Sequence, residues 1–529
     1  MAASLARYLG LAVLPLYLFV SLVIGWAARR KSSTSSEFLN ASKSLPLWVV
    51  AAAFFSVNCG ALEIVGLSAA AAQYGVQAFH FYWIGAIPGI VFMGGVMIPL
   101  YMRSGVHSLP EYLERRFDAR VRLINAWLLL VIGTAISGIG LYAVAQVLNA
   151  VYQWPFFASV TLVAGVVLVY VLVGGLRATI FNEVFRVAII VLGLLPLLGL
   201  STTSLHPAAA SLPGTHARLW LALPSISPAS ELDRLGVIGG LGMVLSFSYW
   251  CTDFVLVQRA LTARTVKSGQ MVPLLAGFAK LGFSFLVICP ALGAAEYLGR
   301  RMPASFDQTL PVLMTASYSP LLMGLGLTVL LASLMSALGA NVSAFSALWT
   351  EEIYRRSFRR EATERHYLRM GRFSIVAAVA LSIGTSYITF RFRDLMEYNQ
   401  LLFSLFSAPF FAMFLLGLFG KKATARGALA GIAVGVAAAL LHLLLVATRF
   451  IQYGSMMTAS FYIAMVGFIA AMIAGLAFSN RAERKSDADL DLLVYRHRGD
   501  GALASPTRLW WALAAILVCA CALLNYWWR

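Results

Sequence analysis

The sequence predicts an all-α protein that crosses a membrane many times. Of its 529 residues, 60% are hydrophobic and only 12% are charged, a balance that no soluble domain of this length could bury in one core. Apolar runs of about 20 residues, the length that crosses a ~30 Å hydrocarbon layer, recur along the whole chain. They predict about fourteen transmembrane helices and leave no room for a soluble domain.

The first predicted span covers residues 9–28 and ends in the basic sequence AARRK, with only Arg7 ahead of it. A cleaved signal peptide carries its charge in front, so we expect an uncleaved helix whose N-terminus lies outside the cell. The other predicted spans follow at residues 47–74, 80–101, 122–151, 156–174, 178–201, 236–258, 271–296, 318–350, 372–390, 397–419, 426–448, 458–478 and 508–527.

Loop charge sets the expected orientation. Most of the 40 Lys and Arg residues lie in loops on one side of these spans, including 29–46, 102–122, 352–372 and 479–508. Cytoplasmic loops carry such an excess, so we expect these loops inside and both termini outside. The formal net charge of +18 then reflects orientation in the lipid bilayer, not a nucleic-acid partner. We expect a multi-pass plasma-membrane protein, or an inner-membrane protein in a bacterium.

Neither the two longer loops nor the cysteines indicate a further domain, and the sequence contains no catalytic motif. Residues 202–235 are rich in Ser, Pro and Ala and predict an external loop, whereas residues 479–507 mix both charge signs and predict a solvated linker. All five cysteines lie in apolar segments, which favours packing over a disulfide framework or a metal site. No nucleophile with a base and no phosphate loop occurs at a spacing that suggests catalysis.

One apolar run contains a carboxylate. In FFSVNCGALEIVGLS, residues 54–68, the polar residues Asn58 and Glu63 lie near the centre of a predicted span, and Glu63 has a glycine on either side, Gly60 and Gly66. A carboxylate at that depth costs at least ~2.5 to 3.5 kcal/mol and normally faces a cavity, a partner or an ion. We expect an interrupted helix with a binding site at its break. The alternative is a helix kinked for packing, in which Glu63 pairs with another helix.

A second polar cluster lies in SFSYWCTDFVLVQR, residues 246–259. If the first helix is set aside, the Glu63 helix opens a run of five spans, and this helix opens the next five from the opposite side. Broken helices at matching places in two inverted halves are typical of a transporter site at the bilayer midplane. We therefore expect repeats at 47–201 and 236–424, an extra helix and cytoplasmic loop at 1–46, and three further helices within 425–529.

Several segments also carry recognisable motifs, namely SVNCGALEIVGL, GGLRATIFNEVFR, YWCTDFVLVQRALTA, GFAKL, LASLMSALGANVSAFSALWTEEIY and FFAMFLLGLFGKKATARGA. In this order they resemble the sodium/solute symporter family, and specifically its sodium/glucose cotransporter branch, over residues 36–440. The resemblance implies a leucine-transporter-type fold with two inverted five-helix repeats. It also implies alternating access to a central small-molecule solute, driven by a sodium gradient.

The resemblance implies a solute site at positions of five core helices: Asn58, Glu63, Tyr82, Tyr249, Trp250, Lys280 and Gln400. Glu63 stands where the family has His or Gln, and Tyr82 stands where it has Glu ahead of a Trp. A carboxylate at 63 is a strong acceptor for paired hydroxyls, but it would also suit a cationic solute. Lys280 lies within a span and needs a partner, for which Glu63 is the nearest candidate.

For sodium, the resemblance implies the carbonyl groups of Ser56 and Cys59, the carbonyl group of Ser333 and the hydroxyl of Ser336. A second family serine is replaced by Ala337, so one ligand is missing. Freed carbonyls and hydroxyls supply the hard oxygens that sodium prefers. No organic cofactor is expected.

Other polar positions leave the coupling open. A further family serine becomes Ala340, and the acid of the fifth core helix is Glu183, so a second sodium ion is not expected. We expect Asp253 and Arg259 to form a structural or gating pair. The leading hypothesis is sodium-coupled symport of a sugar or similar polar solute. The alternatives are proton-coupled or uncoupled transport of a cationic solute, through Glu63 or Glu183, and a transporter-like solute sensor.

Overall fold

The computed structural model describes residues 45–202, 218–220, 232–298, 303, 305–480, 483–495 and 506–528, except 61, 107, 393 and 491, together with parts of 12–27. Within these ranges the chain is built of helices, and extended residues meet only where Leu45 bridges Ala263. The predicted first span lies only partly within the described residues. Its described Tyr17 is buried and stacks on Phe185 at a ring-centroid distance of 5.8 Å.

The first half of the described chain forms the helical segments α3 (Leu47–Val57), η1 (Leu62–Gly66), α4 (Leu67–Tyr74), η2 (Gly75–Phe79), α5 (His80–Trp83), α6 (Ile87–Phe92), η3 (Met93–Met97), α7 (Ile98–Arg103), α8 (Leu109–Arg116), α9 (Ala119–Tyr152) and α10 (Phe156–Thr202). The second half forms η4 (Gly236–Ser246), α12 (Phe247–Thr252), α13 (Phe254–Leu261), α14 (Val266–Leu298), η6 (Phe306–Gln308), α15 (Thr309–Ser317), α16 (Pro320–Ala347), η7 (Leu348–Phe358), α17 (Glu364–Ser386), η8 (Ile388–Arg391), α18 (Leu395–Leu402), η9 (Phe403–Ser407), α19 (Ala408–Phe419), α20 (Ala425–Ala447), α21 (Met456–Ala477) and α22 (Arg508–Trp527).

Many of these helices are long and apolar enough to cross a membrane. The described residues contain ten, or eleven if the bent pair Gly236–Thr252 and Phe254–Leu261 counts as one span. Shorter apolar helices cover Leu47–Val57 and Phe156–Val169. A multi-pass membrane protein is therefore confirmed, whereas the number fourteen stays a prediction.

The stretch predicted as two spans, 156–174 and 178–201, is helical throughout. Residues 156–202 form the single helix α10, with no loop at Arg177. The prediction separated two spans at Arg177, but Gly174 and Gly175, which precede it, lie within the helix. Glycine weakens a helix by only about 1 kcal/mol, and tertiary contacts readily override that preference.

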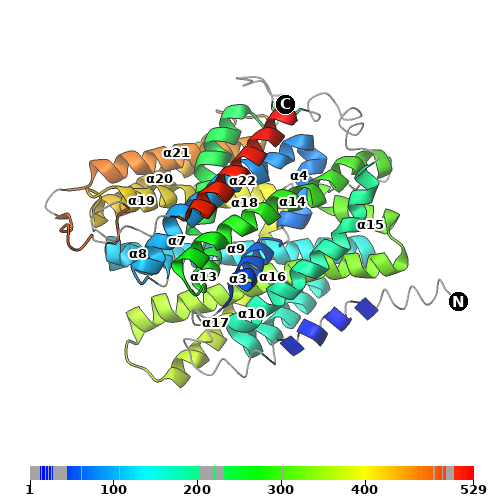
Figure 1. The fold of residues 1–529 in the computed structure, drawn as a ribbon, viewed down its shortest axis with the longest axis horizontal. Coiled ribbons are helices and arrows are strands. Elements are labelled where there is room, and N and C mark those ends of the chain that lie inside the picture. Colours follow the sequence, from blue (N-terminus) through cyan, green and yellow to red (C-terminus); the bar gives the residue numbers. More distant parts are fainter. Residues whose placement is uncertain are drawn as a thin grey trace.

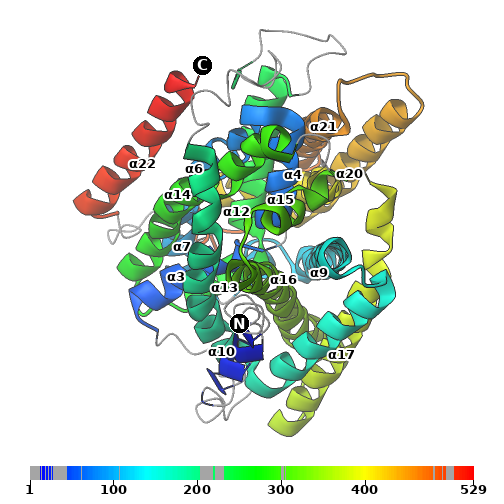
Figure 2. The same cartoon turned by 90° about the vertical axis from the view of Figure 1, so that its right-hand side faces the viewer.

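Helices α3, α9, α14 and α16 lie at the centre of the molecule, and α20 and α21 pack side by side at one end (Figure 1). Helix α22 packs on α14 and lies at the opposite edge from α17 (Figure 2). The exposed faces of the outer helices are apolar, for example Leu444 on α20 and Leu523 on α22. Such faces suit contact with lipid.

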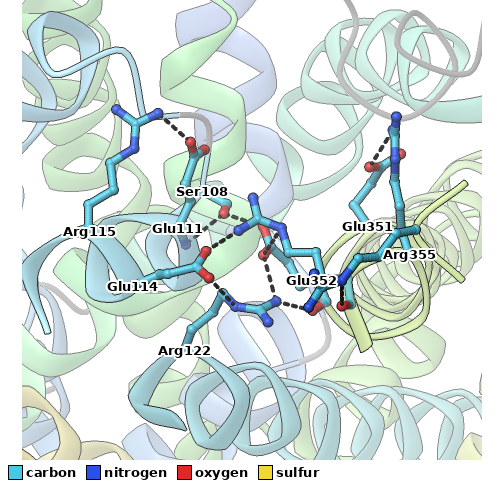
Figure 3. Close-up of polar contacts among 10 residues, drawn as sticks. Ser108, Glu111, Glu114, Arg115, Arg122, Glu351, Glu352 and Arg355 are labelled. Atoms are coloured by element: carbon cyan, nitrogen blue, oxygen red, sulfur yellow. Dashed lines mark hydrogen bonds and ion pairs between the residues drawn. The ribbon is translucent and has the colours of Figure 1, made fainter. Parts of the chain in front are cut away.

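A network of ion pairs joins the start of α9 to α8 and η7 (Figure 3). Arg122 is buried and contacts both Glu114, at 3.4 Å, and Glu352, at 3.7 Å. Glu352 also accepts a hydrogen bond from the Ser108 hydroxyl, and Arg356 pairs with both glutamates. The network therefore links segments about 240 residues apart in sequence.

The expectation of a solvated linker at 479–507 is wrong for its central part. Leu490, Leu493 and Val494 are buried. The Tyr112 hydroxyl of α8 donates to the Leu493 carbonyl at 2.9 Å, and the Tyr495 amide donates to the carbonyl of Leu418 on α19 at 2.8 Å. Charges of both signs surround this short apolar run in the sequence. The sequence pattern therefore indicates a solvated segment and does not reveal the residues that pack against α8 and α19.

Candidate solute and ion site

The first core helix is interrupted where the sequence predicts a break. Helix α3 ends at Val57 and the π-helical turn η1 begins at Leu62. Across the gap the Asn58 amide donates to Phe55 and the Cys59 amide donates to Ser56, three residues back in each case. The regular four-residue pattern is lost there, and Glu63 lies within η1. π-Helical turns of this kind occur frequently at functional sites.

The second predicted break is also present. Helices α12 and α13 meet at Asp253 with a bend of 53°. Asp253 caps α13 because its carboxylate accepts from the Leu256 amide at 2.9 Å. The expected pair between Asp253 and Arg259 is therefore wrong: Arg259 donates instead to Glu183 of α10 at 2.9 Å, and both side chains are fully buried. Glu183 is the nearer anion that compensates the buried guanidinium.

One hydrogen bond connects the two broken helices. The Tyr249 hydroxyl on α12 donates to Asn58 Oδ1 at 2.7 Å. The neighbouring Trp250 is buried, stacks on Phe54 and donates to the Gly85 carbonyl at 3.2 Å. The aromatic pair thus fixes the position of α12 against the break in the first helix.

A cavity of about 130 Å³ lies between these helices. At roughly 10–15 Å³ for each water molecule, it has room on the order of ten waters, which is the size of a small solute. All seven residues predicted to bind solute line this one cavity: Asn58, Glu63, Tyr82, Tyr249, Trp250, Lys280 and Gln400. The structure therefore brings together residues that are up to 342 positions apart in sequence.

An ion pair lies in the wall of the cavity. The Lys280 ammonium of α14 lies 2.7 Å from Glu63 Oε2 and 3.4 Å from the Asn58 carbonyl oxygen. It also faces the rings of Tyr82 and Trp250, at 5.0 and 5.6 Å from their centroids. Lys280 is almost fully buried, whereas the Glu63 side chain keeps 20% of its surface. The cavity therefore presents a carboxylate whose charge is already balanced.

The predicted sodium positions meet where α16 packs against the first break. A Cβ atom built on Gly60 would lie 2.8 Å from the Ala337 Cβ and 3.9 Å from the Ser333 carbonyl oxygen. Only glycine allows α16 to approach this closely. The Ser333 hydroxyl donates to Leu330 at 2.8 Å and keeps lone pairs that can accept a cation. Ser336 lies on α16, but its side chain is outside the described part.

The family model for the sodium:solute symporter family matches residues 38–435. The chain belongs to this family. Sodium/glucose cotransporter of Vibrio parahaemolyticus is 27% identical over 80% of this chain and 83% of its own length. The sodium/myo-inositol cotransporter of Mus musculus is 28% identical over 83% of this chain and 67% of its own length.

A solved structure shares the fold of this chain. The outward-open state of a Na⁺-coupled sialic acid symporter aligns with a TM-score of 0.76 and 19% identity, and covers 90% of this chain and 98% of that one. At this identity the likeness concerns the fold. The helical architecture of the chain is therefore that of a solved sodium-coupled symporter.

Two polar residues of this family member line the cavity without having been predicted to bind solute. Asn341 of α16 and Asn399 of α18 both face it. Asn399 precedes the predicted Gln400, and Asn341 lies one turn beyond Ala337. The helical spacing of four residues between Ala337 and Asn341 is the signal that could have identified the second residue.

Proposed function

We propose that this chain catalyses sodium-coupled symport of a small neutral solute rich in hydroxyl groups, with sugars as the substrate class. Membership of the sodium:solute symporter family and the resemblance to sodium/glucose cotransporters support this assignment. The observation that carries it is the 2.7 Å ion pair between Lys280 and Glu63 in the cavity wall.

Charge balance favours a neutral solute. A free carboxylate in the cavity would attract a cationic group, but Lys280 already compensates Glu63. The pair still offers charged donors and acceptors to hydroxyl groups, and charge-assisted hydrogen bonds are about twice as strong as neutral ones. Asn58, Asn399 and Gln400 add amide groups, and the ring of Trp250 offers a flat apolar wall.

Sodium would occupy the first break, held by the carbonyl oxygens of Ser56, Cys59 and Ser333 and by the Ser336 hydroxyl. Ala337 leaves this set one hydroxyl short, so water is the remaining ligand in our proposal. Glu183 would not carry a coupling proton, because its carboxylate pairs with Arg259 at 2.9 Å. Ion binding would tie α3 to α16 and so favour one state of alternating access.

The membrane arrangement completes the proposal. We place inverted repeats of five spans each at 47–201 and 236–424, within a leucine-transporter-type fold of about fourteen spans. The last two spans of the first repeat are then the two apolar stretches of α10, Phe156–Val169 and Ile180–Gly199. The basic loops lie in the cytoplasm and both termini lie outside the plasma membrane.

The test is a substrate panel in proteoliposomes containing the purified full-length protein. Accumulation of labelled neutral monosaccharides, or of an inositol, under an inward sodium gradient would be measured beside an amino sugar and a sugar acid. We expect neutral solutes to accumulate and the charged analogues to compete weakly. Accumulation of the amino sugar alone would replace this proposal with transport of a cationic solute.

A further inference from the structure

Arg186 of α10 lies beside the proposed sodium site and is 2% exposed. Its one hydrogen bond among the described residues is long: the guanidinium donates to the Ser56 hydroxyl at 3.4 Å. Its Nε has no hydrogen-bond partner there. A buried guanidinium normally has a carboxylate partner, because an uncompensated charge is costly at this depth.

The two neighbouring buried cations are paired. Lys280 lies 2.7 Å from Glu63, and Arg259 lies 2.9 Å from Glu183. In the described part of the chain, no carboxylate lies within ion-pair distance of Arg186. The cluster around the helix break therefore contains one cation without a paired anion.

The positive charge of Arg186 lies close to the residues that would hold sodium. Ser56 and Cys59 contribute the two carbonyl ligands from the first core helix in the proposed site. Arg186 contacts the side chain of Ser56 directly, and its charge also acts on the side chain of Cys59. Repulsion between two cations is weakly screened inside a protein, and salt does little to reduce it there.

We propose that Arg186 sets a low sodium affinity by electrostatic repulsion of the ion at Ser56 and Cys59. The inference rests on the sodium-coupled function proposed above and assigns the strength of ion binding to one residue that is not itself a ligand. A weak site fills only where sodium is abundant and empties readily where it is scarce. Arg186 would then favour release of the ion into the cytoplasm over tight binding.

The test is direct binding of radioactive sodium to the purified full-length protein, measured without solute. Arg186→Gln removes the charge and keeps a donor for Ser56, whereas Arg186→Lys keeps the charge. We expect Arg186→Gln to lower the half-saturating sodium concentration by about tenfold, equivalent to about 1.4 kcal/mol. Arg186→Lys should stay within about threefold of the wild type, as should Arg426→Gln, which removes an exposed charge on α20.

A second variant neutralises the charge without replacing the arginine. Asn182 lies one helical turn before Arg186 on α10 and is buried. Asn182→Asp is nearly isosteric and places a carboxylate at the (i, i+4) position, where it can pair with the guanidinium. It should raise sodium affinity in the same direction as Arg186→Gln, and it tests the inference even if the latter fails to fold.

The possible outcomes distinguish a failure of the role proposed for Arg186 from a failure of sodium-coupled symport. Sodium binding to the wild type with unchanged or weaker affinity in Arg186→Gln and Asn182→Asp would overturn the role of Arg186 and leave the symport proposal standing. Binding that becomes measurable only in these two variants would support the inference. Absence of binding in the wild type and in both variants would overturn sodium coupling and the inference together.

Discussion

Lys280 and Glu63 form an ion pair across the break in the first core helix, with 2.7 Å between Nζ and Oε2. The same ammonium lies 3.4 Å from the Asn58 carbonyl oxygen, one of the groups that the interruption frees from regular helical bonding. The pair therefore joins α14 to the break and, at the same time, forms a charged wall of the cavity. Stability and solute recognition should both depend on it.

Removing one partner of this pair should destabilise the protein more than removing both. Lys280→Gln leaves Glu63 without its cation, which in a buried pair costs about 3–5 kcal/mol. We expect a lower cost here because Glu63 is partly exposed. The double variant Glu63→Gln, Lys280→Gln should recover much of the loss in thermal unfolding followed by tryptophan fluorescence. Solute affinity should be lowered in Lys280→Gln, in Glu63→Gln and in the double variant. Losses of stability that add up from the two single variants to the double variant would contradict the pairing.

Restoring the missing hydroxyl should strengthen ion binding. Ala337 lies on the cavity and against Gly60, where the family has a serine. Ala337→Ser adds one oxygen ligand of the kind that sodium prefers, so the half-saturating sodium concentration for solute uptake should fall several-fold. Ala344→Ser on the same helix, in a cluster with Ala126 and Leu130, serves as the control. An unchanged sodium dependence in Ala337→Ser would place the ion elsewhere.

Two adjacent glutamates of η7 should differ sharply in their contribution to stability. Glu352 is buried, accepts a hydrogen bond from Ser108 and forms an ion pair with Arg122 within the network of Figure 3. Glu351, in contrast, forms a more exposed pair with Arg355. Glu352→Gln removes a buried charge and should lower the free energy of unfolding by about 2–4 kcal/mol. Glu351→Gln should cost at most about 0.5 kcal/mol. Equal shifts in the melting temperature would contradict the network's role.

The dependence of protein stability on pH should be governed by Asp307, in the segment between α14 and α15. Burial, with a smaller contribution from the charge of Asp394, raises the pKa of Asp307 from 3.8 to about 8. The folded protein therefore holds a proton that the unfolded chain releases above pH 4. Stability should fall as pH rises from about 4 to about 8, by up to about 1.4 kcal/mol per pH unit, and then level off.

The matched variants for this prediction are Asp307→Asn and Asp487→Asn. The first should flatten the change of melting temperature between pH 4 and 8, because the asparagine side chain does not titrate. The second replaces an exposed carboxylate of the linker and should leave the wild-type profile unchanged. A wild-type profile that persists in Asp307→Asn would show that another group is responsible.

Sequence reasoning predicted the two helix breaks because each signal is local, whereas the residues of the cavity were predicted from the resemblance of the motifs to a known family. Polar groups and glycines in an apolar run cannot be accommodated by a regular helix in lipid, so Glu63 and Asp253 mark breaks without any knowledge of packing. The pairing of Lys280 with Glu63 was also predictable, since both charges lie within spans and each needs a partner.

Other relationships depend on three-dimensional packing. Arg259 pairs with Glu183 and not with the nearby Asp253, because the Asp253 carboxylate is directed to the amide end of α13. The burial of Leu490, Leu493 and Val494 likewise depends on contacts with distant segments. Neither local composition nor charge could predict which neighbour each of these residues would meet.

The measurement that tests the central claim most directly is uptake of a labelled neutral monosaccharide or inositol into proteoliposomes, with an inward sodium gradient, an inward proton gradient or neither. We predict accumulation above the external concentration with the sodium gradient and simple equilibration, or less, in the other two conditions. A favourable potential of 100 mV contributes about 2.3 kcal/mol per sodium ion, enough to concentrate a neutral solute more than tenfold. Accumulation that requires the proton gradient, or equal uptake in all three conditions, would contradict sodium-coupled symport.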